Sequence, residues 1–316
     1  MEDTNSPYEL HFAPLQGYTD AIFRNAYDRF FGGVTAYYTP FIRVKGKNTF
    51  KNRDLRDMEP ENNTVSRLIP QILPGSPEEF RLLAELLLSK GYRAADINMG
   101  CPFPMIAGKK KGAGMLPYPE LVGEVLETLK EYPQIEFSLK LRLGWENARE
   151  CMVLVDIINN LRLSHVTLHA RLGKQQYKGV PDIGAFRHFY EVCKHPLFYN
   201  GDLKKVEECK QILTEFPLLR GVSIGRGLIS SPLLAKEWMK NETFTEKKRM
   251  SLLSGFHEAL FSAYSERLQG ENQLLTKMKT LWEYFLPETD RKALKKIKKS
   301  SKLADYISVV NSVFGR

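Results

Sequence analysis

The sequence predicts a (β/α)8 TIM barrel of the α/β class, followed by a small C-terminal helical bundle. Short apolar runs alternate with amphipathic ones from the N-terminus to about residue 240, and this alternation then stops. Eight strands separated by helices over about 230 residues fit a barrel. A doubly wound open sheet is the rival fold. It usually carries a phosphate loop after its first strand, but APLQGYTD at 13–20 lacks the G-x-G-x-x-G pattern.

The predicted strands are short apolar runs, rich in β-branched and aromatic residues and bounded by turn-forming residues. Their ranges are 9–14, 35–39, 68–73, 95–99, 137–143, 165–170, 196–200 and 221–225. The last two end in polar segments that contain glycine, and barrel enzymes often bind phosphate at those two positions.

Helix-like segments follow most of the strands. The clearest covers 76–91, where Ser76 can cap the helix, Pro77 suits its first turn and Gly91 can end it. A second covers 119–133. The connection after the second strand carries the basic run 43–56, and its composition predicts a long irregular segment.

The C-terminal part has a different pattern. Apolar residues recur with helical period through 246–268, 271–286 and the last thirty residues, without the alternation of strands. We therefore expect a catalytic barrel domain of residues 1–240 and a helical domain of residues 241–316.

Composition limits the class of protein. The 316 residues are 43% hydrophobic and 26% charged, as is ordinary for a globular protein. No apolar stretch approaches the roughly 20 residues of a membrane span, and the polar start does not resemble a signal peptide. Four scattered cysteines without a C-x-x-C pair predict neither disulfides nor a zinc site. We expect a monomer without membrane contact in a reducing cytoplasm.

The chain is basic, with a formal net charge of +9. This charge fits a generically basic protein as well as a protein with a polyanionic partner. Three clusters, at 43–56, 109–111 and 291–302, are more informative because phosphates favour grouped Lys and Arg. For 291–302, a solvated helix face is an equally good interpretation.

Polar and glycine residues follow nearly every predicted strand. In a barrel, the residues just beyond the carboxyl ends of the strands surround one mouth. Singly, some have plainer explanations, such as a core histidine, a tight turn or a buried structural cysteine; together they predict a site. The residues are Pro14, Leu15, Gln16, Gln71, Asn98, Cys101, Lys140, Arg142, His169, Arg171, Asn200, Gly201, Asp202, Gly225 and Arg226.

Two of these features indicate a ligand. Lys140 and Arg142 alternate in SLKLRL, and in a barrel that face lines the lumen, where an unpaired lysine is costly. Lys140 therefore predicts an anionic or acceptor-rich ligand. The glycines after the last two strands let backbone N–H groups approach a phosphate, and Arg226 adds a fork of donors.

In their order, seven segments resemble the flavin-dependent tRNA-dihydrouridine synthases. The resemblance covers roughly residues 9–240, and the helical part resembles that family's RNA-binding bundle more loosely. NMGCP followed by GAG is its most specific part, and Leu15 stands where the family usually has Met. The segments are APLQGYTD, QILPGSP, DINMGCPFP with GAGML, LKLRLGW, LHARLGKQQYKG, NGDL and IGRG.

The resemblance implies an FMN-bound barrel that reduces the C5–C6 double bond of a tRNA uridine to 5,6-dihydrouridine, with NADPH as the reductant. It implies substrate contacts from Arg142, Arg171 and Tyr177, and a grip on tRNA phosphates from Lys109, Lys110 and Lys111 beside the mouth. The flavin contacts that it implies are Pro14, Leu15, Gln16, Gln71, Asn98, Lys140, His169, Asn200, Gly201, Asp202, Gly225 and Arg226.

Cys101 is the general acid that the resemblance implies. Hydride addition at C6 leaves negative charge on C5 and the O4 carbonyl, so a proton must reach C5. A thiol with an ordinary pKa of about 8.5 is mostly protonated at neutral pH and can donate that proton. Gly100 and Pro102 restrict the loop that carries it.

Two other functions compete with this one. A small-molecule FMN oxidoreductase of the dihydroorotate dehydrogenase-like barrel type would need neither the basic clusters nor the helical region. An RNA-binding protein with a lapsed flavin site would not keep the full set from Gln71 to Arg226. The sequence leaves open which tRNA uridine is reduced and whether NADPH or NADH is preferred.

Overall fold

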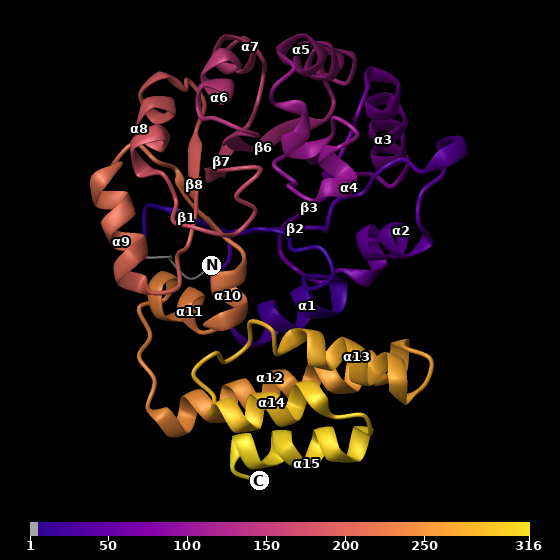
Figure 1. The fold of residues 1–316 in the computed structure, drawn as a ribbon, viewed down its shortest axis with the longest axis vertical. Helices are drawn as coiled ribbons and strands as arrows, with labels where there is room; N and C mark the ends of the chain where they lie inside the picture. The colour runs from indigo at the N-terminus through magenta and orange to yellow at the C-terminus, as the bar shows by residue number, and fades with distance from the viewer. Residues whose placement is uncertain (1–5) are drawn as a thin grey trace.

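The computed structural model describes residues 6–316 as a barrel of nine parallel strand segments with helices around it (Figure 1). The strands lie side by side in the order β3-β2-β1-β9-β8-β7-β6-β5-β4. Because β3 and β4, at the two ends of this order, follow one another in the chain, the sheet closes into a ring. The barrel prediction is confirmed, and the open doubly wound alternative is wrong. The strands are β1 (Glu9–Phe12), β2 (Ala36–Tyr38), β3 (Leu68–Ile69), β4 (Gln71–Ile72), β5 (Ala94–Met99), β6 (Glu136–Gly144), β7 (Val166–Leu172), β8 (Leu197–Asn200) and β9 (Gly221–Ile224).

The nine segments correspond to the eight predicted strands, whose ends all fall within two residues of the prediction. The extra segment arises at Pro70, which divides the third strand into β3 and β4. Proline has no N–H for the ladder, although its carbonyl still accepts a bond from the Asp96 amide. β3 pairs with β2, and β4 pairs with β5.

Helices connect the strands and cover the barrel. The predicted helix at 76–91 is α3 (Pro77–Ser89); the Ser76 hydroxyl accepts from the Glu79 amide, and Gly91 follows with a positive φ of 79°. The connection after β2 was predicted to be irregular, but it contains the helix α2 (Asn52–Met58). The other helices of the barrel are α1 (Ala21–Phe30), α4 (Pro104–Ala107), α5 (Pro119–Glu127), α6 (Arg149–Val153), α7 (Val155–Asn159), α8 (Ile183–Val192), α9 (Val206–Glu215), α10 (Arg226–Ser230) and α11 (Leu234–Met239).

The C-terminal region is helical, as predicted, and packs against α1 (Figure 1). Phe256 of this region inserts its ring between Phe23 and Phe31, with centroid distances of 5.5 and 5.0 Å. The predicted boundary near residue 240 falls between α11 and the first of these helices, but the division into two domains stays a prediction. The helices are α12 (Glu246–Arg267), α13 (Glu271–Leu281), α14 (Arg291–Lys299) and α15 (Leu303–Phe314).

Polar contacts join the C-terminal helices to the loop after β1. Lys277 pairs with Asp20 at 2.7 Å and donates to the Gly17 carbonyl at 2.9 Å. The Tyr264 hydroxyl donates to the Asp20 carboxylate at 2.6 Å. The helical region therefore holds the loop that carries Gln16. Across residues 6–316, none of the helices combines the length and the apolarity that crossing a bilayer requires.

Candidate active site

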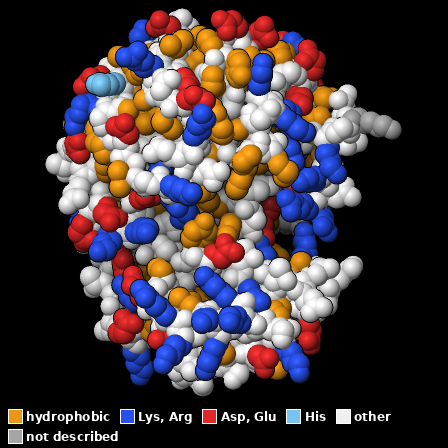
Figure 2. All heavy atoms as spheres, in the orientation of Figure 1, with side chains coloured by type: hydrophobic (Ala, Val, Ile, Leu, Met, Phe, Trp, Pro, Cys, Tyr) orange, Lys and Arg blue, Asp and Glu red, His pale blue; other side chains and the backbone are white. Residues whose placement is uncertain are grey.

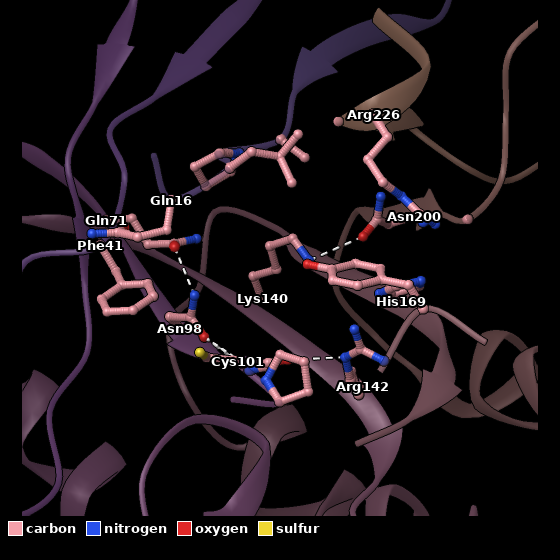
Figure 3. A pocket seen from close by; sticks show the side chains of 18 of the residues that line it. Gln16, Phe41, Gln71, Asn98, Cys101, Lys140, Arg142, His169, Asn200 and Arg226 are labelled. Carbon is pink, nitrogen blue, oxygen red and sulfur yellow. Dashed lines mark hydrogen bonds between the residues drawn. The ribbon is translucent and has the colours of Figure 1, made fainter. Parts of the chain in front are cut away.

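A cavity opens at the carboxyl ends of the barrel strands. Together with the open space at its mouth, it has a volume of about 850 Å³. The strand ends and the loops after them supply its walls (Figure 3). The lining residues include Pro14, Leu15, Gln16, Phe41, Gln71, Asn98, Cys101, Lys140, Arg142, His169, Tyr177, Asn200, Gly201, Asp202, Lys204, Gly225 and Arg226.

The structure thus brings together Cys101 and every residue predicted to contact the cofactor. Arg142 and Tyr177, predicted to contact the substrate, also line the cavity. Arg171 and the three lysines of 109–111 are not among the residues that line it.

Two side-chain amides and a carboxylate form a chain of hydrogen bonds beside the cavity. Gln71 donates to the Asp96 carboxylate at 2.6 Å, and Asn98 donates to the Gln71 carbonyl oxygen at 2.7 Å. The Asn98 oxygen in turn accepts from the backbone amides of Gly100 and Cys101, at 3.0 and 2.9 Å. Figure 3 shows Asn98 between Gln71 and Cys101. The chain fixes the first residues of the Cys101 loop.

Cys101 follows β5 at the edge of the cavity, and only 5% of it is exposed. Burial raises the pKa of its thiol, although the Phe103 amide and the charge of Arg142 oppose the shift. The thiol is therefore protonated at neutral pH. Gly112 lies directly against it: a Cβ on Gly112 would come within 2.8 Å of the Cys101 Cβ, and its φ of 58° favours glycine.

Lys140 lies at the centre of the cavity, on β6 (Figure 3). Its ammonium group donates to the Asn200 carbonyl oxygen at 3.0 Å, and the Asn200 amide donates to the Ser223 carbonyl. Burial lowers the pKa of Lys140 to about 8, and the charge of Arg142 acts in the same direction. A partly buried cation whose hydrogen-bond partner is neutral is a strong site for an anionic or acceptor-rich ligand.

His169 is a neutral group of the cavity wall. Burial and the charges of the surrounding cations, Arg142 first, hold the pKa of His169 well below its ordinary value. Arg171 donates toward its Nε2 atom at 3.4 Å, so Nε2 accepts and the ring proton is on Nδ1. His169 can therefore donate one hydrogen bond from Nδ1, but it carries no charge at physiological pH.

Arg171 is fully buried behind the cavity and pairs with Asp202. Its two terminal nitrogens donate to the two carboxylate oxygens at 2.9 and 2.5 Å, and one also donates to the Gly179 carbonyl. Arg226 shares the Asp202 carboxylate at 2.8 Å. Burial acts to raise the pKa of Asp202, but the hydrogen bond and charge of Arg171 outweigh it and hold that pKa below its ordinary value. The predicted contact of Arg171 with the substrate does not fit this buried position.

Arg142 and Tyr177 form another part of the cavity wall. Arg142 donates to the Gly100 carbonyl at 2.9 Å and to the carbonyls of Leu172 and Gln176. Its guanidinium lies 5.5 Å from the centre of the Tyr177 ring, and that of Arg226 lies 4.4 Å from it. Arg142 therefore joins the Cys101 loop to the loop of Tyr177.

The three lysines of 109–111 have different surroundings. Lys109 and Lys110 are exposed, and Lys110 lies 4.2 Å from the centre of the Tyr118 ring. Lys111 is instead paired with both carboxylate oxygens of Glu79, at 2.5 and 2.6 Å. The prediction treated the three alike, but only the first two present free charge beside the mouth.

A second hollow adjoins the cavity and is lined by residues of α1, α2, α12 and α13. The two share Gln16 and Pro40 as lining residues. Exposed cations line this hollow: Arg53, Arg56 and Arg267. Figure 2 shows further Lys and Arg side chains over the C-terminal helices, where α14 exposes most of its cations.

Sequence reasoning missed several lining residues. Phe41 packs against the small apolar cluster of Leu73, Cys101 and Ile106, although it lies beyond the predicted strand 35–39. Lys204 adds a cation after β8, and Asp96 anchors the amide chain. The polar residue within the apolar run ADINM was the available signal for Asp96.

Known proteins resemble this chain over most of its length. A family model described as dihydrouridine synthase (Dus) matches residues 11–309. The tRNA-dihydrouridine synthase B of Pasteurella multocida is 26% identical over 250 residues, 79% of this chain and 73% of the relative. That of Vibrio parahaemolyticus is 26% identical over 267 residues, 82% of each chain.

Solved structures share the fold at low identity. The old yellow enzyme of Trypanosoma cruzi superimposes with a TM-score of 0.53 at 10% identity, covering 77% of this chain and 91% of that one. Morphinone reductase in complex with tetrahydroNAD gives a TM-score of 0.54 at 9% identity, covering 77% and 90%. These similarities support the barrel fold.

Proposed function

Because the chain belongs to the dihydrouridine synthase family, we propose that it reduces the C5–C6 double bond of a uridine in tRNA, using FMN and NADPH. The observation that carries the proposal is the single cavity in which Cys101 lies with the complete set of predicted flavin contacts. Family membership supports tRNA as the substrate. The NADPH preference, the monomeric state and the cytoplasmic location remain predictions.

The residues of the cavity suit FMN. The Gln16 carbonyl oxygen is buried and has no hydrogen-bond partner within residues 6–316, so it suits a ligand that carries an N–H group, as the flavin ring does. Lys140 is a desolvated donor that suits the polar edge of that ring. Arg226 and Lys204 place positive charge beside Gly201 and Gly225, which suits a phosphate.

When bound, reduced FMN supplies the hydride for C6 of the uracil. Cys101 donates the proton to C5, because burial keeps its thiol protonated and its loop is held on both sides by Asn98 and Arg142. Lys140 and Asn98 orient acceptor groups in the cavity through their N–H donors.

Three exposed arginines in the hollow beside the cavity support a nucleic-acid substrate, although Asp20, Asp54 and Asp57 also line that hollow. A tRNA must extrude one uridine to bring it into a barrel mouth, and the protein must bind the phosphates beside that uridine. Arg53, Arg56 and Arg267 line a hollow that shares Gln16 with the cavity. We propose that these cations and the exposed lysines at 109 and 110 contact the tRNA backbone.

The test uses purified protein and an unmodified tRNA transcript. We expect bound FMN by absorbance, and one defined dihydrouridine in the tRNA after incubation with NADPH, mapped by mass spectrometry. The variant Cys101→Ala, loaded with FMN, serves as the matched control. A protein that binds no flavin after reconstitution, or that leaves every uridine unchanged in several tRNAs, would contradict the proposal.

A further inference from the structure

Asp96 is a buried carboxylate that the mechanism above does not use. It lies on β5, is 1% exposed, and accepts hydrogen bonds at both oxygens. Ser138 donates to one oxygen at 2.7 Å, and Gln71 donates to the other at 2.6 Å. Burying a carboxylate this deeply costs free energy that hydrogen bonds only partly offset, so its position in the site needs an explanation.

The register of the barrel brings these groups together. Gln71 on β4 is the partner of Asp96, and Asp96 is the partner of Ser138 on β6. Three adjacent strands therefore present a polar layer inside the barrel. Asn98 is two residues beyond Asp96 on the same strand, so its side chain points to the same face one layer closer to the cavity.

The direction of each hydrogen bond in the chain is determined at both ends. Backbone N–H groups only donate, so the Asn98 atom that faces the amides of Gly100 and Cys101 must be its oxygen. Its nitrogen therefore faces Gln71, whose oxygen accepts. The nitrogen of Gln71 then faces Asp96, which must accept. An ionised carboxylate meets this need because it can only accept.

We propose that Asp96 is a positioning residue that orients the amides of Gln71 and Asn98 and, through them, holds the backbone of Cys101. Gln71 and Asn98 both line the cavity, and each amide nitrogen has a second N–H besides the one used in the chain. Asp96 thereby ensures that both residues offer donors to a ligand. The same contacts set where the Cys101 loop begins.

The electrostatics of Asp96 agree with this role. Burial raises the pKa of Asp96 to about 6, while the bonds from Ser138 and Gln71 and the charge of Lys140 oppose the shift. At neutral pH the carboxylate is mostly ionised and accepts at both oxygens. The charge makes the bond from Gln71 stronger than one between neutral groups.

The experiment measures how fast iodoacetamide alkylates Cys101 in the ligand-free protein, with mass spectrometry of the individual cysteine peptides. Because only 5% of Cys101 is exposed, alkylation requires the loop to move. Asp96→Ala should raise the rate at least about tenfold, the effect of a lost charge-assisted hydrogen bond. Asn98→Ala should raise it at least about tenfold as well, because it removes the acceptor of two backbone amides of the loop. The double variant should react no faster than the faster single variant, because both substitutions interrupt the same chain of hydrogen bonds.

Two conservative variants serve as controls. Asp96→Asn keeps an acceptor for Gln71 and should alkylate within about threefold of the wild type. Ser138→Ala removes the other bond to the same carboxylate, at equal burial, and should also leave Cys101 nearly unchanged. If Asp96→Ala does not fold, Gln71→Met interrupts the chain at its middle link and carries the same expectation.

The inference rests on the proposed function for the role of Cys101, but the alkylation needs neither cofactor nor tRNA. It can therefore fail while the proposed function stands. An alkylation rate for Asp96→Ala equal to that of the wild type would overturn the inference. So would a Ser138→Ala variant as reactive as Asp96→Ala, because that result would mean that any lost bond in the layer loosens the loop.

Discussion

Arg171 and Asp202 form a two-point ion pair in which the arginine side chain is fully buried and the carboxylate faces the cavity. Asp202 also binds Arg226, so the buried arginine helps to fix the position of a half-buried one. The pair thus acts on the cavity from behind, through the residues predicted to hold the phosphate of the cofactor.

Arg171→Lys should weaken FMN binding by roughly 10- to 100-fold. A lysine ammonium cannot bind both carboxylate oxygens and the Gly179 carbonyl as the planar guanidinium does, so Asp202 and Arg226 lose their support. Fluorescence titration of the ligand-free protein with FMN measures the effect. Arg187→Lys, in the exposed pair with Glu215, is the matched control. Unchanged FMN affinity with lost tRNA affinity would instead support the direct substrate contact that the sequence predicted.

Lys140→Met should stabilise the ligand-free protein while weakening FMN binding. The pKa of Lys140 in the folded state, about 8, is below its ordinary value of 10.5, so folding disfavours the charged form. After subtraction of the lost bond to Asn200, we expect a gain of about 1–2 kcal/mol at pH 7. Chemical denaturation of the ligand-free protein measures it.

The pH dependence of that gain has a definite sign. Between pH 8 and 10.5 the unfolded wild type binds more protons than the folded one, so the wild type gains stability as the pH rises. The advantage of Lys140→Met should therefore be largest below pH 8 and shrink toward pH 10.5. A constant difference across this range would mean that Lys140 titrates normally in the fold.

Cys101→Ala should keep the fold and the flavin but slow the reduction of tRNA by 10²- to 10⁴-fold, the usual effect of a lost general acid. Single-turnover formation of dihydrouridine measures this rate. Cys101→Ser should recover little, because a hydroxyl is a far weaker acid than a thiol. NADPH consumption in the absence of tRNA is the internal control and should not change. Wild-type tRNA reduction by Cys101→Ala would remove Cys101 from this role.

Reversing the charge of Lys109 and Lys110 together should weaken tRNA binding and flatten its salt dependence, with FMN still bound. Each lost phosphate contact reduces the log–log slope by about 0.7 to 0.9. Lys130 and Lys194 make a matched control pair: both are exposed and precede strands β6 and β8, at the end of the barrel away from the mouth. If both double variants have the same slope, the two lysines beside the mouth contact only solvent.

Most of the fold could be predicted from the sequence because each strand is a short apolar run with turn-forming residues at its ends. The same regularity predicted the site, since groups that follow parallel strands meet at one mouth. α2 was missed because its segment NRDLRDM has few apolar residues to reveal a helical period. The two segments of the third strand were missed because a single proline hardly alters an apolar run.

Contacts between segments far apart in the chain change the surroundings of two predicted site residues. Arg171 lies at the carboxyl end of β7, and its pairing with Asp202 depends on the side-by-side position of β7 and β8. Lys111 is likewise neutralised by Glu79, 32 residues earlier in the chain. The part played by Asp96 depends on the register of three strands, which the sequence does not display.

Pro70 marks a weak point in the backbone hydrogen bonding of the barrel, beside the candidate active site. At this position the chain passes from pairing with β2 to pairing with β5, and the next amide, that of Gln71, donates to the Thr39 hydroxyl instead of a backbone carbonyl. The Gln71 amide thus lacks a backbone acceptor at a residue that lines the cavity, although the amides of Asp96 and Ile42 still donate to the carbonyls of Pro70 and Gln71. Local opening of the barrel should concentrate there. Amide hydrogen exchange at Gln71 should therefore be faster than at its neighbours in β5, and it should slow when the cavity is filled.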